Sequence, residues 1–267
     1  MDAPASGVMP PHPSTSTLPL RVRPGRPPGS TRASGTASAR PVQPANGEVH
    51  IWSVGLGAPR ETVARLLATL SLEERERAAR LHADHDRRRF IVAHGALRGV
   101  LAHYLGTSPS SIGFVRRGSG ASALGPEWGD RLRFSLADSG ELALVVVAQD
   151  ADVGVDVERV RAHRDWAEIA HGYFSAAERE QLQSLPNHRR AVAFVRCWTK
   201  NEAFRKALGD SVAGPSATGS GDVAEARVWS IHTLRPAPGY IGALAIEGSG
   251  SRLRYRRWPG LRTTFSD

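Results

Sequence analysis

This chain shows nearly the same order of helix- and strand-forming patterns in each of its two halves. The first half is expected to hold a strand at 48–56, helices at 58–70, 71–81 and 84–106, and a hairpin at 132–149. The second half is expected to hold a strand, three helices and three further strands, at 153–160, 164–171, 175–186, 188–208, 227–236, 240–248 and 251–258. Helices beside small antiparallel sheets predict the α+β class. Two similar halves in tandem predict a pseudo-twofold arrangement with a cleft between them, although no sequence repeat is visible.

The segment before the first strand has a different composition. Residues 1–47 hold ten of the eighteen prolines and five arginines, with Asp2 as the only acid. Such a segment cannot bury enough apolar surface to order itself, so a disordered basic tail is predicted. The predicted organisation is therefore a tail over 1–47, an N-terminal half over 48–150 and a C-terminal half over 151–267. A loop is expected at Gly118–Gly129.

The charge of the chain indicates an anionic partner. The net charge is +9 and the isoelectric point is near 10.8, which suits nucleic acid, an acidic protein or a phosphorylated ligand. No basic-helix or stacked-aromatic motif supports nucleic acid. Cys197 is the only cysteine, so an intrachain disulfide is excluded. No apolar run has the length of a transmembrane helix and no secretory signal is visible, so we expect a cytoplasmic protein with no membrane partner. We also expect a monomer.

Three carboxylates carry the chemistry that the sequence suggests. Asp156 and Glu158 lie two residues apart on an expected strand, so their side chains face the same side. Glu202 lies on an expected helix, one turn before Lys206. Carboxylates that meet in a cleft make an oxygen-rich site for Mg²⁺, which also binds substrate phosphates. The alternative is that Asp156 and Glu158 are surface acids on an edge strand. Glu202 and Lys206 would then form an i, i+4 ion pair that stabilises the helix by about 0.2–0.5 kcal/mol.

Six blocks between about residues 71 and 212 occur in the order of a known family. They are SLEERERAARLHADHDRRRF, HGALRGVLAHYLG, FSLADSGELALVVVA, VGVDVERV, FSAAERE and WTKNEAFRKALG. In these blocks the chain resembles the 4′-phosphopantetheinyl transferases of the surfactin-synthetase-activating type. The resemblance implies that family's fold of two α+β halves. It also implies an enzyme that transfers the phosphopantetheine arm of coenzyme A to a serine of an acyl or peptidyl carrier protein, as in secondary metabolite biosynthesis.

The same resemblance assigns roles to individual residues. Asp156, Glu158 and Glu202 would hold Mg²⁺, with Asp156 and Glu202 also counted as catalytic. Glu202 would orient or deprotonate the attacking serine, and Lys206 would bind and protonate the departing phosphate. The remaining coenzyme-binding positions implied by the family are Arg77, Arg89, Asp138, Ser139 and Asn201. Arginine suits phosphate binding because its guanidinium donates two parallel hydrogen bonds. A basic surface also suits an acidic carrier protein.

Several positions depart from the family pattern. Asn201 stands where the family has a lysine, Asp138 where it has a histidine, and Gly120-Ala121-Ser122 where Gly-Lys-Pro is usual. Arg205, or one of the pair Arg116 and Arg117, is available to compensate for the lost cations. The departures leave a second hypothesis open: a non-catalytic or repurposed relative that binds coenzyme A or a carrier protein.

Overall fold

The computed structural model describes residues 44–117, 121–129, 132–161, 166–209 and 227–260. All of them belong to one unit, Pro41–Asp267. The tail predicted over 1–47 lies outside the described residues up to position 43, as do Gly118 to Gly120 of the predicted loop. None of the helices within the described residues is long and apolar enough to cross a membrane.

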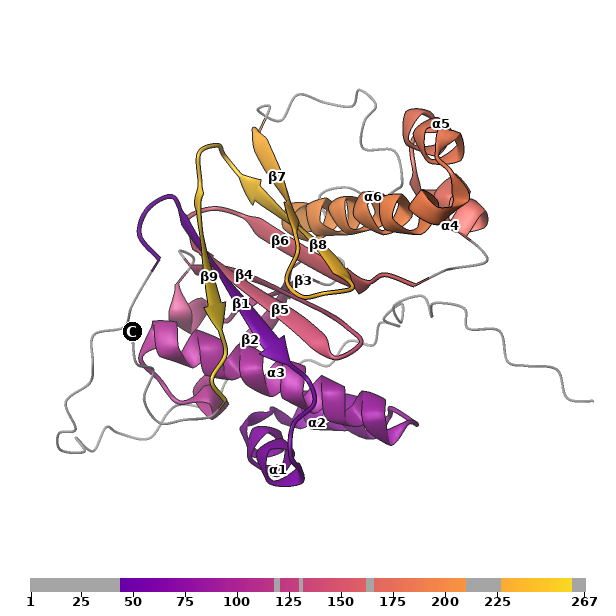
Figure 1. Cartoon of the computed structure of the whole chain (residues 1–267). Helices are drawn as coiled ribbons and strands as arrows, with labels where there is room; N and C mark the ends of the chain where they lie inside the picture. Colours follow the sequence, from indigo (N-terminus) through magenta and orange to yellow (C-terminus); the bar gives the residue numbers. More distant parts are fainter. Residues whose placement is uncertain (1–43, 118–120, 130–131, 162–165, 210–226, 261–267) are drawn as a thin grey trace, which may run out of the picture. The chain divides into compact units, whose positions relative to one another are not determined.

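The element order agrees with the predicted α+β class (Figure 1). The first half contains β1 (Glu48–Gly55), α1 (Arg60–Thr69), α2 (Leu72–Ala79), α3 (Asp84–Leu105), η1 (Pro109–Ser111), β2 (Phe114–Arg117), β3 (Ala121–Leu124), η2 (Pro126–Trp128), β4 (Leu132–Ser139) and β5 (Leu142–Gln149). The second half contains β6 (Val153–Arg159), α4 (Trp166–Tyr173), α5 (Ala176–Ser184), α6 (Asn187–Leu208), β7 (Trp229–Leu234), β8 (Tyr240–Glu247) and β9 (Arg252–Arg257).

The two halves share one topology. The strand order β4-β5-β1 in the first sheet corresponds to β7-β8-β6 in the second, and each of these neighbouring pairs is antiparallel. α3 and α6 each have 22 residues. α2 and α5 each begin with a capping box, made by Ser71 with Glu74 and by Ser175 with Glu178. A box of this kind satisfies two backbone N–H groups at a helix start.

One strand departs from the predicted division of the chain. β9 was expected with the C-terminal half, but it pairs with β1 in parallel and so completes the first sheet as β4-β5-β1-β9. Leu253 packs into the core shared by the two sheets, and Trp258 packs on the helix side of the first sheet. These two side chains anchor β9 beside β1. Alternation of residues predicts a strand, but it does not tell which sheet the strand joins.

A second difference concerns the predicted glycine-rich loop at Gly118–Gly129. Its described part contains the strand β3, which pairs with β2 in a short antiparallel ladder, and the turn η2. β3 has the sequence ASAL, which carries no strong strand pattern. Short strands of this kind depend on their partner strand more than on intrinsic preference.

The core forms between four layers. Trp52, Val54 and Val145 face α1–α3 from one side of the first sheet. From its other side, residues such as Ile51 and Val146 pack on the second sheet. The far face of the second sheet carries α6 through a row of small residues: Ala203, Ala207, Ala243 and Ala245. Figure 1 shows α3 beside the first sheet and α6 beside β6 and β8.

Candidate functional site

The candidate site begins with the close contact between β6 and α6. A side chain at Gly154 would overlap the backbone of Ala203 and Ala207, so the helix lies directly on the strand at this position. Only glycine leaves room for such an approach. Because side chains alternate along a strand, Val153, Val155 and Val157 face the core between the sheets. Asp156 and Glu158 therefore share the side of Gly154, toward α6.

Asp156 and Lys206 meet across this contact. The Lys206 Nζ donates to the Asp156 Oδ1 at 2.7 Å. The Asp156 side chain is 7% exposed and the Lys206 side chain is 27% exposed. A partly buried ion pair between residues 50 positions apart fixes strand and helix in register. The sequence prediction placed both residues in one site, and the structure brings them into contact.

Glu158 lies beside this pair in a crowded acidic environment. Its Oε2 accepts a hydrogen bond of 2.7 Å from the Ser139 Oγ, at the end of β4. Burial, together with the charges of Asp156 and Asp138, raises the pKa of Glu158 to about 7 against the opposing effects of Ser139 and Lys206. A cation bound here would favour the ionised form.

Ser139 connects the two sheets at this point. Besides donating to Glu158, its Oγ accepts a hydrogen bond of 3.1 Å from the backbone N–H of Arg159. Ser135, four residues earlier on β4, accepts in the same way from the backbone N–H of Val155 at 3.1 Å. These two hydroxyls hold β4 alongside β6. Asp138 and Ser139, predicted as coenzyme-binding residues, thus lie next to the acidic residues of β6.

Glu202 is the third predicted metal ligand and is held by a neighbouring arginine. Its side chain is 8% exposed, and it accepts two hydrogen bonds from Arg205, from Nε at 3.2 Å and from Nη2 at 2.6 Å. The pKa of Arg205 is raised by this hydrogen bond, and the charge of Asp156 contributes to the same effect. Glu202, Arg205, Asp156 and Lys206 therefore interact as one charged cluster.

The residues of this cluster have the donor chemistry for a divalent cation. The donors are oxygen atoms only, as Mg²⁺ prefers. Burial, with the like charges of Asp156 and Asp138, raises the pKa of Glu158, and a bound cation would favour its ionised form. Within the described ranges, no three His, Cys, Asp or Glu side chains are already arranged to hold a metal ion. Instead, Asp156 and Glu202 are paired with Lys206 and Arg205. The ligand set Asp156, Glu158 and Glu202 remains a prediction.

The tip of the β4–β5 hairpin adds a cation from the first half. Arg89 on α3 donates from Nε to the Glu141 Oε1 at 3.0 Å and forms an ion pair with the same carboxylate. The backbone N–H of Glu141 donates to the Tyr240 hydroxyl at 3.0 Å. Arg89 therefore lies at the turn that follows Asp138 and Ser139. The sequence analysis missed Glu141 and Tyr240, because their contacts span 52 and 99 residues.

Two other predicted coenzyme-binding residues have structural contacts of their own. The Arg77 guanidinium lies over the Phe90 ring, 5.4 Å from its centroid. The Asn201 amide hydrogen-bonds to Glu178, which also accepts from Cys197 and Ser175. Burial raises the pKa of Glu178, but these hydrogen bonds outweigh it and lower the pKa overall. Asn201 therefore contacts the start of α5.

Cys197 is a thiol packed against the core beside α4 and α5. Burial and the neighbouring Glu178 carboxylate raise the pKa of the Cys197 thiol. A raised thiol pKa disfavours the thiolate that a nucleophile requires.

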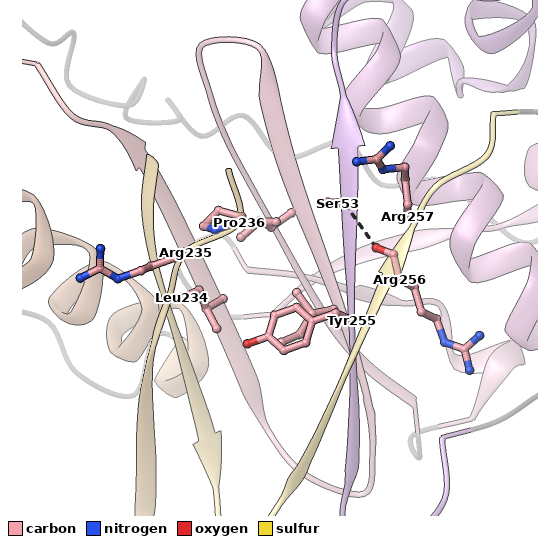
Figure 2. Close-up of a pocket in the computed structure, with 9 residues that line it drawn as sticks. Ser53, Leu234, Arg235, Pro236, Tyr255, Arg256 and Arg257 are labelled. Carbon is pink, nitrogen blue, oxygen red and sulfur yellow. Dashed lines mark hydrogen bonds between the residues drawn. The ribbon is translucent and has the colours of Figure 1, made fainter. Parts of the chain in front are cut away.

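A cavity of about 300 Å³ lies away from the charged cluster (Figure 2). Ser53, Leu234 and Tyr255 line it, together with backbone and side chains of three arginines. Figure 2 shows the guanidinium groups of Arg235, Arg256 and Arg257 pointing in different directions. Arg256 lies over the Trp52 ring, 5.5 Å from its centroid. The cavity contains none of the predicted site residues and does not gather its positive charges on one ligand position.

Comparison with known proteins identifies relatives of this chain. The family model of the 4′-phosphopantetheinyl transferase superfamily matches residues 152–245, which include Asp156, Glu158, Glu202 and Lys206. The 4′-phosphopantetheinyl transferase HetI of Nostoc sp. is 35% identical over 211 residues, which cover 76% of this chain and 89% of HetI.

Two further relatives match over a shorter stretch. The 4′-phosphopantetheinyl transferase AcpT of Escherichia coli is 29% identical over 114 residues, or 43% of this chain and 56% of AcpT. A 4′-phosphopantetheinyl transferase of Bacillus subtilis is 26% identical over 151 residues, or 57% of this chain and 65% of that protein.

Proposed function

Since this chain belongs to the 4′-phosphopantetheinyl transferase superfamily and is a transferase enzyme, we propose that it moves the 4′-phosphopantetheine arm of coenzyme A to a serine of a carrier protein, with Mg²⁺. The observation that carries the proposal is the contact between β6 and α6. It places Lys206 on Asp156, with Glu158 on the same side of the strand and Glu202 one helical turn before Lys206. These are the residues to which the resemblance assigns the chemistry.

The proposed reaction is a phosphoryl transfer. The serine Oγ forms a bond to the β-phosphorus of coenzyme A, the bond from that phosphorus to the bridging oxygen breaks, and 3′,5′-ADP leaves. Glu202 orients the serine and takes its proton, while Lys206 binds the departing phosphate and can supply a proton to it. Asp156, Glu158 and Glu202 would hold Mg²⁺, which neutralises charge on the pyrophosphate. Positioning and charge neutralisation supply most of the catalysis in such reactions.

The remaining coenzyme contacts belong to the same proposal. Arg77 and Arg89 are assigned to the 3′-phosphate, Asp138 and Ser139 to the coenzyme near the hairpin tip, and Asn201 on α6 to the coenzyme's phosphates. Arg89 already pairs with Glu141, so it would bind phosphate with part of its guanidinium or after leaving that carboxylate. The finer assignment to the surfactin-synthetase-activating type is supported by the presence of both α+β halves in one chain.

The partner and the cellular setting belong to the same proposal. A net charge of +9 suits an acidic acyl or peptidyl carrier protein. We propose a monomer that acts in the cytoplasm and serves secondary metabolite biosynthesis. The nucleic-acid alternative has only the charge in its favour.

A second candidate function is supported by the acidic hairpin tip. Asp138 acts on Glu158 as a like charge, and the Asn201 amide is taken up by Glu178. An anion at this position repels phosphate, so a relative that binds coenzyme A or a carrier protein without transfer is the alternative.

Mass spectrometry of a carrier protein decides between the two. Recombinant acyl and peptidyl carrier proteins are incubated with this protein, coenzyme A and Mg²⁺. We expect a mass increase of one phosphopantetheine arm with wild type and a rate at least about tenfold lower with Asp156→Asn, because a lost charged contact costs about 1.5–3 kcal/mol. Absence of modification with wild type on every carrier protein, together with intact coenzyme A binding, would favour the non-catalytic alternative.

A further inference from the structure

The charged cluster at β6 and α6 has more acidic than basic groups. Four carboxyl groups interact there: Asp138, Asp156, Glu158 and Glu202. Within the part of the chain that the structure describes, Lys206 contacts Asp156 and Arg205 contacts Glu202. A pyrophosphate brought to this cluster would meet an excess of negative charge. Each cation that can reach it therefore matters to binding.

Arg205 is placed to reach a ligand while it stays near Glu202. Its Nε and Nη2 form the fork on the carboxylate. The Arg205 side chain is 65% exposed, whereas that of Glu202 is 8% exposed. The outer part of the guanidinium thus faces solvent at the edge of the cluster. Among the described residues, Glu202 is the acceptor of both side-chain hydrogen bonds that Arg205 donates.

Arg205 lies on the same face of α6 as Asn201, which stands where the family has a lysine. Residues four apart in a helix lie on the same face, separated by about 40°. Arg205 is four residues after Asn201 and therefore lies one turn further along the same face. The Asn201 amide is engaged by Glu178 at the start of α5. Arg205 instead interacts with Glu202 and with the charge of Asp156.

We infer that Arg205 is a phosphate-binding residue that exchanges Glu202 for the pyrophosphate of coenzyme A. In the metal-free protein its guanidinium holds the buried Glu202 carboxylate. When a divalent cation takes that carboxylate, Arg205 donates its paired N–H groups to pyrophosphate oxygens. A guanidinium binds carboxylate and phosphate with the same planar fork, so the exchange keeps its hydrogen bonds satisfied. The inference rests on the proposed function for the identity of the ligand.

The exchange predicts effects of opposite sign on metal and on coenzyme. Calorimetric titration with Mn²⁺ alone should show tighter binding to Arg205→Met than to wild type, by about threefold or more, because the metal no longer competes with a cation for Glu202. Titration with coenzyme A in the presence of Mg²⁺ should show binding about tenfold weaker, the loss of one charged hydrogen-bonded contact. Arg205→Lys keeps the charge without the fork and should fall between. A simple stabilising ion pair would free Glu202 for the metal in the same way, but its loss would not weaken coenzyme A binding.

A shortened coenzyme identifies the phosphate that Arg205 binds. 3′-Dephospho-coenzyme A keeps the pyrophosphate, so Arg205→Met should weaken the binding of this compound by the same factor as the binding of coenzyme A. Arg196→Met, an exposed arginine on the same helix, is the matched control and should leave all three affinities unchanged. Unchanged Mn²⁺ or coenzyme A affinity in a folded Arg205→Met would overturn the inference. So would a loss of affinity for coenzyme A that does not extend to 3′-dephospho-coenzyme A. These titrations need no transfer, so they stay decisive even where the transfer assay contradicts the proposed function.

Discussion

Glu158 is the residue whose ionisation depends most clearly on its surroundings. Burial, Asp156 and Asp138 raise its pKa from an ordinary value of 4.5 to about 7. A carboxyl group with a raised pKa in the folded state favours the folded state in its protonated form. Its contribution is fully present below pH 4.5 and is lost as the pH rises through about 7.

The first prediction follows from this shift. In the presence of a chelator, the thermal midpoint of wild type should fall by a few degrees between pH 5 and pH 8, and Glu158→Gln should remove part of that fall. Each kcal/mol shifts the midpoint of a chain of this size by about 2–4 °C. Differential scanning calorimetry at several pH values measures it. Parallel profiles for the two proteins would show that Glu158 titrates normally.

Individual residues also show where sequence reasoning stops. Asp156, Glu158, Glu202 and Lys206 could be named from spacing and resemblance, because alternation on a strand and one helical turn determine which side chains share a face. Asn201 could not be placed, since its partner Glu178 lies on another helix. Nothing in the local sequence indicates that Glu141, in the turn of the hairpin, binds Arg89 on α3.

At the level of elements, the contact of β6 with α6 positions the site. Gly154 permits it, because the helix backbone occupies the place of a side chain. The small residues Ala203 and Ala207 complete the contact and are buried. The strand and the helix could each be predicted from the sequence. Their close approach becomes visible only in the folded chain.

Gly154→Ala is therefore expected to disturb both stability and the site. Overpacking of a tight contact typically costs about 1–3 kcal/mol, and movement of α6 would separate Lys206 from Asp156, so transfer should fall at least about tenfold. Chemical denaturation and the carrier-protein assay measure the two effects. Gly55→Ala on β1, where a side chain meets open space, is the control. Equal stability of the two variants would contradict the close contact.

The elements that the sequence misplaced share a physical cause. β9 joins the first sheet through long-range pairing with β1, and β3 exists through its pairing with β2. Neither pairing leaves a periodic signal in its own segment. The long helices α3 and α6 and the hairpin β4–β5 were predicted well because their patterns are local and span many residues.

For the molecule as a whole, residues 1–43 are predicted to contribute little to stability. Their composition does not allow a hydrophobic core. A truncated protein that begins at Pro44 should therefore keep its thermal midpoint within about 2 °C and its transfer rate within about twofold, as surface changes usually stay within 0.5 kcal/mol. A larger drop in either quantity would show that this segment packs on the rest of the chain or takes part in partner binding.

The whole molecule brings together residues of both halves: Ser139 from the first sheet, the acids of β6, and the cations of α6. We expect this junction to be the place where coenzyme A and Mg²⁺ bind together. The binding of coenzyme A should therefore depend on Mg²⁺ and the binding of Mg²⁺ on coenzyme A. Both affinities should depend on the carboxylates of the second half.

Calorimetric titration of coenzyme A with and without Mg²⁺ tests this most directly. In wild type, Mg²⁺ should tighten coenzyme A binding by at least about tenfold, or about 1.4 kcal/mol. Asp156→Ala and Glu202→Ala should each abolish that difference, while Glu76→Ala, on the exposed surface of α2, should preserve it. Unchanged affinity and unchanged metal dependence in both Asp156→Ala and Glu202→Ala would mean that these carboxylates are structural acids and that coenzyme A binds elsewhere.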